Sequence, residues 1–180
     1  NPQQKAIALV NDNSFVQLGG EKKLSYNNLL DLDAAINIAY HSSSKESICT
    51  IVKHNIPCGG AIKKRQKDSY LKALAGDPLS AFGGIVAFNQ KLTLETAKLL
   101  VKNFYEVIAA PGFEKDVIKL LQTKKNLRIL KVRKFKNPTE QRSIFAGALI
   151  QDNNTKKSQV NSIHGTNKLN KDKLNFFVNI

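Results

Sequence analysis

The stretch ICTIVKHNIPCGG, residues 48–60, decides the fold of this chain. Its first part, residues 48–52, is apolar and rich in β-branched side chains, which is typical of a buried strand. Lys53 and His54 end that strand, and the PCGG run at residues 57–60 favours a break in the backbone. Because ligands of open α/β sheets bind at the carboxyl ends of strands, a cation beside an imidazole at this point indicates a functional site.

Helices and strands are expected to alternate along the rest of the chain. Apolar spacing predicts a helix over residues 26–40, which Ser25 or Asn27 can cap. Further strands are expected at residues 5–10, 15–18, 85–88, 107–110, 127–132 and 144–151, and further helices at 68–75, 94–104 and 115–122. Thr93 is the expected N-cap of the third helix, and Gly76 the end of the second. This alternation predicts an α/β domain with a layered, largely parallel sheet and flanking helices.

Composition excludes several classes of protein. The chain has 180 residues, of which 42% are hydrophobic, so it can bury the core of one globular domain. No apolar run approaches the ~20 residues that cross a bilayer, and residues 1–10 lack the layout of a secretory signal. Two cysteines make no disulfide framework, so we expect a cytoplasmic protein without a membrane partner. The domain should span residues 1–152, followed by a polar, mobile tail at residues 153–180.

The formal net charge of +14 raises the possibility of a nucleic-acid partner. The lysines are spread over the whole length among many asparagines, and no nucleic-acid-binding motif is present. We therefore expect no nucleic-acid partner, although a basic surface attracts anionic small molecules.

Lys53 and His54 have two possible roles. A neutral imidazole is a candidate general base, and a neighbouring ammonium can stabilise negative charge on an attacked carbonyl oxygen. Adjacent residues of a regular strand point to opposite faces, so both reach one site only if the strand breaks. The alternative is a solvated lysine beside a structural histidine, which the spacing alone favours.

A second glycine-rich run, GDPLSAFGGIVAFN at residues 76–89, supplies further candidates. Gly83 allows a ligand to approach the backbone closely, and Phe82 can stack on a heterocycle; the alternative is a tight loop with one buried aromatic. Glu106, at the start of an expected strand, can accept hydrogen bonds from an amine or a ribose hydroxyl, or can simply face water. Asn28 can present its amide to a ligand or cap its own helix.

Metal chemistry is not expected. Zinc deaminases carry H-x-E and P-C-x-x-C motifs, whereas His54 here lacks the glutamate and Cys58 lacks the second cysteine. Because Cys58 follows a basic pair, the pKa of its thiol can be lowered, but no base beside it makes it a nucleophile, so we expect Cys58 to be a small packed residue.

Four segments, in order and with the right spacing, resemble one enzyme family. They are LSYNNLLDLDAA, VKHNIPCGGAI, DPLSAFGGIVAFN and EVIAAPGF, and they resemble the N-terminal half of the transformylase region of AICAR transformylase/IMP cyclohydrolase. The resemblance runs from Asn1 to about Gln151, with Gln3 in place of a usual histidine. It implies a cytidine-deaminase-like fold without the zinc, and homodimers whose sites are built across the subunit interface.

The resemblance also implies a reaction, which is formyl transfer from 10-formyltetrahydrofolate to the 5-amino group of AICAR. In that family His54 matches the histidine that takes the proton of the attacking amine, and Lys53 matches the lysine that stabilises the transition state. The matching substrate-binding positions are Asn28 and Glu106 for AICAR, Gly83 for a backbone contact, Phe82 at the folate-facing wall and Asn55 in the loop.

The resemblance does not cover the cyclohydrolase domain or the second transformylase half. We therefore expect this chain to be a fragment of the full enzyme. The alternative is a non-catalytic, nucleotide-binding remnant of the same fold.

Overall fold

The computed structural model describes residues 5, 7–8, 14–41, 44–133 and 139–152. The chain divides into two compact units, residues 1–134 and residues 135–180. The first unit holds a six-stranded sheet and the second a two-stranded one. The tail expected at residues 153–180 and residues 6, 9 and 10 of the strand expected at residues 5–10 lie outside the described residues, whereas residues 5, 7 and 8 are described and form no strand.

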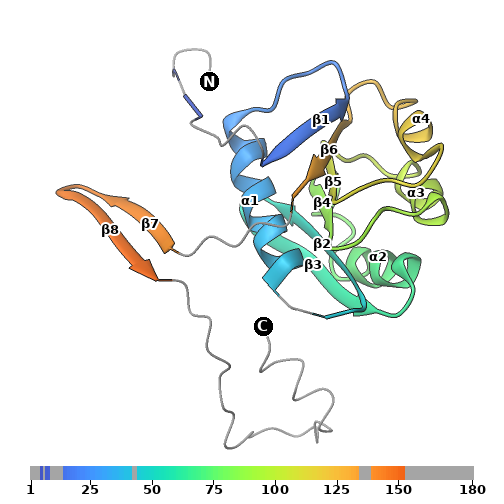
Figure 1. Ribbon diagram of the computed structural model, residues 1–180, viewed down its shortest axis with the longest axis horizontal. Coiled ribbons are helices and arrows are strands. Elements are labelled where there is room, and N and C mark those ends of the chain that lie inside the picture. Colours follow the sequence, from blue (N-terminus) through green and yellow to red (C-terminus); the bar gives the residue numbers. More distant parts are fainter. Residues whose placement is uncertain (1–4, 6, 9–13, 42–43, 134–138, 153–180) are drawn as a thin grey trace, which may run out of the picture. The chain divides into compact units, whose positions relative to one another are not determined.

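The six-stranded sheet has the order β1-β6-β5-β4-β2-β3 (Figure 1). Two of its five pairings are parallel, β4 with β5 and β5 with β6, and the other three are antiparallel. The layered α/β fold with flanking helices is confirmed, whereas the expectation of a largely parallel sheet is wrong. Its strands are β1 Phe15–Gly19, β2 Ser47–Lys53, β3 Ile56–Lys63, β4 Ile85–Phe88, β5 Val107–Ala110 and β6 Arg128–Val132.

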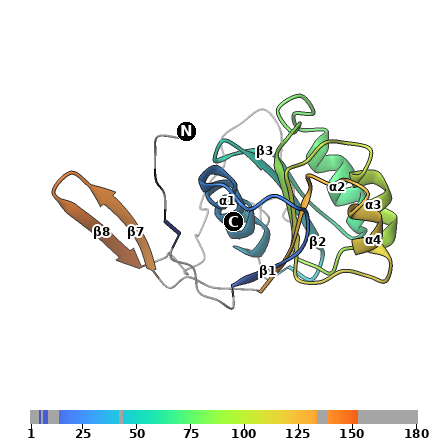
Figure 2. The same cartoon turned by 90° about the horizontal axis from the view of Figure 1, so that it is seen from above.

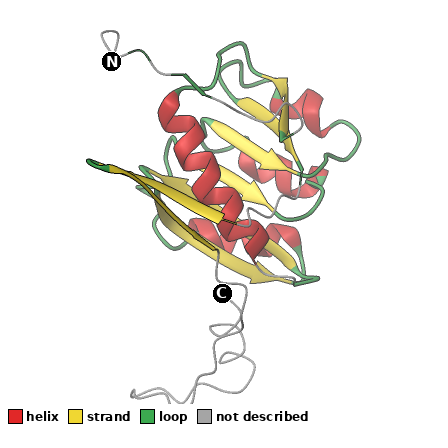
Figure 3. Cartoon of the chain, turned by 60° about the vertical axis from the view of Figure 1, so that its left-hand side comes forward, coloured by secondary structure: helices red, strands yellow, loops and turns green. Residues whose placement is uncertain are grey.

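Helices cover both faces of this sheet. The long helix α1, Tyr26–His41, lies across one face, and three shorter helices cover the other (Figures 2 and 3). These are α2 Gln66–Leu74, α3 Leu94–Leu100 and α4 Val117–Leu121. All four were expected, with α3 and α4 shorter than the sequence indicates. No helix in the described part of the chain is both long and apolar enough to traverse a bilayer.

The two apolar layers follow from the alternation of side chains along the strands. In β4, Ile85 and Ala87 pack in the cluster that contains α1, whereas Val86 and Phe88 pack in the cluster formed with α2–α4. All four residues are buried. A continuous apolar strand of this kind is therefore explained by helices on both faces.

The strand expected at residues 144–151 is wrong. The structure has a hairpin there, with β7 Thr139–Ile144 pairing antiparallel with β8 Gly147–Asp152. The chain reverses between Ile144 and Gly147, and Gly147 has a positive φ of 147°. This hairpin buries none of its strand residues. Its apolar side chains therefore follow no in-and-out alternation from which the turn could be predicted.

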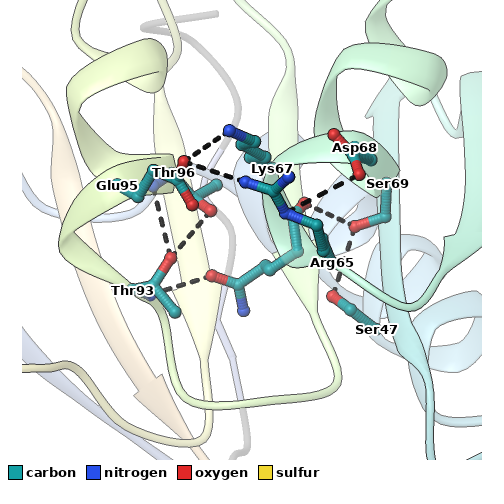
Figure 4. A network of polar contacts seen from close by, with 9 residues as sticks. Ser47, Arg65, Lys67, Asp68, Ser69, Thr93, Glu95 and Thr96 are labelled. Atoms are coloured by element: carbon teal, nitrogen blue, oxygen red, sulfur yellow. Dashed lines mark hydrogen bonds and ion pairs between the residues drawn. The ribbon is translucent and has the colours of Figure 1, made fainter.

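Polar contacts join the start of α2 to the start of α3, and Figure 4 shows Thr93 and Thr96 at the start of α3. Gln66, the first residue of α2, contributes two of these contacts. Its Oε1 accepts a hydrogen bond from the Thr93 amide at 2.8 Å, and its Nε2 donates to the Lys91 carbonyl at 3.1 Å. The Thr93 hydroxyl accepts from the Thr96 amide at 3.2 Å, which confirms the expected N-cap of α3. The ion pairs of Glu95 with Arg65 and Lys67 are exposed and contribute little.

Close approach of β3 to α2 explains two of the glycines. A Cβ atom on Gly59 would lie 2.0 Å from the Ala73 carbonyl oxygen, and one on Gly76 would lie 2.9 Å from the Cys58 carbonyl oxygen. Gly76 follows α2, but its φ is not positive, so it serves packing rather than a left-handed helix end. These glycines let a helix backbone pack directly on a strand backbone.

We expect Gly59→Ala to lower the free energy of unfolding by about 3 kcal/mol, because a backbone oxygen cannot move aside. Gly60→Ala is the matched control, since the nearest atoms to a Cβ on Gly60 lie 3.9 and 4.0 Å away. Urea unfolding of both variants measures the difference. Equal stabilities would show that β3 and α2 are not packed as described.

Candidate active site

The sheet register brings the predicted residues to one end of the sheet. Val52 pairs with Ile85, and Ile85 pairs with Val107, so the row continues across β2, β4 and β5. The residues one step beyond this row are Lys53, Gly84 and Glu106. β2 ends here, but β4 and β5 begin here because β2 is antiparallel to β4. The expectation that the site lies at carboxyl ends of strands therefore holds only for β2.

The backbone reverses at His54 and Asn55, which form a two-residue hairpin loop between β2 and β3. Both have left-handed backbone angles, with φ of 54° and 63°. Two-residue hairpins favour such angles because they match the twist of the strands, and asparagine adopts them readily. The break expected at residues 57–60 is wrong, since these residues lie inside β3, a strand that the sequence did not reveal.

The carboxylate of Asp31, in α1, binds the backbone amides of this turn. Its Oδ2 accepts a hydrogen bond from the His54 amide at 3.1 Å, and its Oδ1 accepts one from the Asn55 amide at 2.6 Å. The side chains of His54 and Asn55 are exposed, and the His54 ring makes no hydrogen bond to the described residues. The convergence of this ring and the Lys53 ammonium on one ligand stays a prediction.

Lys53 connects the two glycine-rich motifs. Its Nζ donates a hydrogen bond to the Phe82 carbonyl at 2.6 Å. Phe82 is 63% exposed as a residue, and its ring lies against that of Phe104, with ring centroids 5.1 Å apart. Phe82 is therefore not the buried aromatic of a tight loop, and its ring is available to a ligand.

Gly83 occupies a position that only glycine fits well. Its φ is 74°, and a Cβ atom there would lie 3.4 Å from the Phe104 ring. Its amide donates a hydrogen bond to the Phe104 carbonyl at 2.9 Å. This donor is already used, so a ligand would meet the carbonyl or the Cα of Gly83.

Glu106 is held by two polar side chains. Its Oε2 accepts a hydrogen bond from Asn28 Nδ2 at 2.7 Å and forms an ion pair with Arg128 at 3.6 Å. Both contacts use one oxygen, and Oε1 has no partner among the described residues. The side chain is 41% exposed, so this free oxygen can accept from a ligand.

Asn28 caps its own helix, which is one of the two roles that the sequence allowed, and its contact with a ligand stays a prediction. Its side-chain Oδ1 accepts a hydrogen bond from the Ser25 backbone amide, and its backbone amide donates one to the Ser25 hydroxyl, each at 3.1 Å. This reciprocal pair caps the start of α1. The Nδ2 of Asn28 orients Glu106, and one Nδ2 hydrogen remains for a ligand. Asn28 is only 5% exposed, so its amide is fixed in place.

Sequence reasoning missed Asp31 and Arg128. Asp31 lies three residues after Asn28 and so shares a helix face with it, a signal that the helix prediction contained. The Arg128 side chain is only 10% exposed, and it donates to the Lys23 carbonyl at 3.2 Å. Arg128 begins β6, next to Val107 of β5, and only the strand register shows that it reaches Glu106.

A cavity of about 470 Å³ adjoins this region. Its aromatic lining includes Phe82 and Phe104, and its cationic lining comprises Lys102, Lys124 and Lys125. Phe82 thus lines the cavity, and its backbone carbonyl accepts the hydrogen bond from Lys53.

The cysteines show no sign of a reactive thiol. Burial is the largest cause that raises the pKa of Cys58, and the charge of Asp77 adds to it, although Lys53 acts in the opposite direction. The basic pair therefore does not bring this pKa below its usual value. Burial also raises the pKa of Cys49, which is fully buried. No group of three metal-ligating side chains occurs among the residues that the structure describes.

Comparison with known proteins agrees with the family that the motifs resemble. The family described as AICARFT/IMPCHase bienzyme matches residues 1–176. The chain belongs to this family. The resemblance seen in the sequence is thereby confirmed.

Curated members of the AICARFT/IMPCHase family are similar over much of this chain. The bifunctional purine biosynthesis protein PurH of Persephonella marina is 43% identical over 86% of this chain and 32% of its own length. PurH of Prochlorococcus marinus strain AS9601 is 40% identical over 99% of this chain and 38% of its own length. The chain thus spans about a third of the length of these relatives. Among solved structures, Acinetobacter baumannii RibD is similar over 58% of this chain and 36% of its own, with a TM-score of 0.43 and 15% identity.

We expect Asn28 and Glu106 to be coupled by about 1–2 kcal/mol in a double-mutant cycle of Asn28→Ala and Glu106→Ala. Loss of the helix cap lowers stability by about 1 kcal/mol in the Asn28 variant, but this effect cancels in the coupling. Urea unfolding of the four proteins gives the value. The control pair is Asn27→Ala with Glu106→Ala, because Asn27 is exposed on the same helix. A coupling no larger than the control would contradict the described contact.

We expect Cys58 to react with iodoacetamide more slowly at pH 7 than free cysteine does, because a raised pKa leaves less thiolate. The pH midpoint of the reaction should lie above that of a cysteine peptide. Mass spectrometry of the native chain follows the adduct, and Cys58→Ser should remain unlabelled since Cys49 is buried. Faster labelling than the peptide would disprove the direction of the shift.

Proposed function

We propose that this chain is part of a purine-biosynthetic enzyme that transfers a formyl group from 10-formyltetrahydrofolate to the 5-amino group of AICAR. Family membership supports a role in purine biosynthesis. The observation that carries the finer assignment is the Lys53–Phe82 hydrogen bond, which unites the two motifs of the transformylase region. Glu106 and Asn28 lie at the same end of the sheet.

The AICAR amine is a weak nucleophile, because its lone pair is conjugated with the ring and the adjacent carboxamide. In the proposed reaction the amine nitrogen attacks the formyl carbon while His54 accepts the amine proton. Lys53 stabilises the negative charge that develops on the formyl oxygen. The bond from the formyl carbon to the folate nitrogen then breaks, and that nitrogen takes up a proton. The products are formylated AICAR and tetrahydrofolate.

The remaining site residues position the substrates in this proposal. Glu106 Oε1 accepts hydrogen bonds from AICAR, Asn28 holds Glu106 and contributes its second amide hydrogen, and Gly83 lets the nucleotide approach the backbone. The exposed ring of Phe82 stacks on the folate. The lysines of the neighbouring cavity suit an anionic co-substrate.

The partners that we propose are the two small molecules and a second copy of the chain in a cytoplasmic homodimer, with neither a catalytic metal nor nucleic acid. A second candidate function is nucleotide binding without catalysis. The His54 ring has no orienting hydrogen-bond partner among the described residues, which favours this alternative.

A formyl-transfer assay of the 180-residue chain with AICAR and 10-formyltetrahydrofolate separates these functions. Formylated AICAR above the uncatalysed rate supports the transferase. Absence of product, together with AICAR binding in calorimetry, supports the binding remnant. Absence of both would reject the proposal.

For an active chain, we expect His54→Ala to lower kcat by about a hundredfold or more, since a general base typically contributes that much. The AICAR dissociation constant should change by less than about threefold, because the ring acts mainly in the transition state. Steady-state kinetics and calorimetry give the two values. Parallel loss of rate and affinity would assign His54 to binding instead of proton transfer.

A further inference from the structure

We propose that Asp31 is the positioning residue for His54, holding the hairpin turn so that the imidazole stays in its working place. This inference rests on the proposed function, in which His54 is the general base. The Asp31 carboxylate contacts the turn only at the backbone amides of His54 and Asn55.

The turn gains from an external partner because positive φ costs each of its two non-glycine residues free energy, even though these angles suit a two-residue hairpin. His54 and Asn55 are consecutive non-glycine residues with positive φ, and such conformations persist only where the surroundings fix them. Both residues are exposed, so apolar packing does not fix them.

Asp31 supplies that partner from a rigid element. Its two carboxylate oxygens each accept one of the turn's two amides, and hydrogen bonds to a charged acceptor are the strong ones. Asp31 lies within α1 and is partly buried, while the same helix packs on the sheet through Leu32 and Ala35. The exposed tip of the hairpin is therefore tied to the core of the unit.

The position of the imidazole depends on these two hydrogen bonds between the turn and Asp31. The His54 ring has no hydrogen bond within the described residues, so only its backbone determines where the ring can reach. Lys53, the preceding residue, is fixed separately by Phe82. Loss of Asp31 should thus displace the base while leaving the ammonium and the Glu106 contacts in place.

The test compares Asp31→Ala and Asp31→Asn with Asp33→Ala as a control. Asp33 is an exposed aspartate of the same helix that bonds to Asn37 and not to the turn. Asp31→Asn keeps one acceptor oxygen, so its effects should lie between those of wild type and Asp31→Ala. It also keeps the inference testable if the alanine variant fails to fold.

The first readout is amide hydrogen exchange of His54 and Asn55 by NMR. We expect at least tenfold faster exchange in Asp31→Ala and no change in Asp33→Ala. Unchanged exchange in Asp31→Ala would overturn the inference, whether or not the chain is active. If the unmodified chain shows no formyl transfer, the proposed function is rejected but the role of Asp31 is not. Amide exchange still decides whether Asp31 holds the turn.

The second readout is formyl transfer. We expect Asp31→Ala to lower kcat about tenfold or more with little change in the KM for AICAR. Asp31→Asn should lose less of kcat than Asp31→Ala, because it keeps one acceptor oxygen for the turn. A kcat that stays at the wild-type value in Asp31→Ala, or a KM that rises in step with the loss of kcat, would show that Asp31 does not position the base.

Discussion

The antiparallel pairing of β2 with β4 is the constraint on which the site depends. It places the end of β2 beside the start of β4, so that Lys53 lies next to the loop that precedes Ile85. The parallel pairing of β4 with β5 then adds Glu106 to the same end. A parallel β2 would have placed Lys53 at the opposite end of the sheet, far from the loop that contains Phe82.

Helix α1 has a second task besides covering one face of the sheet. Asn28 and Asp31 lie on one side of it and reach two different loops, the start of β5 and the β2–β3 turn. Its apolar residues, such as Leu32 and Ala35, anchor it on the sheet. Because both polar contacts start from one rigid helix, the two loops keep a fixed relation to each other.

The site combines buried support with exposed tips. Arg128 and Asn28 are buried and hold Glu106, whereas His54 and the Phe82 ring are open to solvent. Buried side chains have little room to reorient, so Arg128 and Asn28 can fix the carboxylate while the exposed groups remain free to meet a ligand. This division suits the two-substrate reaction that we propose.

The sequence by itself determined the local elements and the family of this chain. Helical spacing identified α1 and its inward face, and Thr93 marked the start of α3, because these signals come from residues close together in the sequence. Only the tertiary structure revealed β3, whose glycines resemble a turn until α2 is packed against them. The contact of Asp31 with the turn likewise depends on how helix and sheet layers pack, and no local pattern encodes a pairing across that distance.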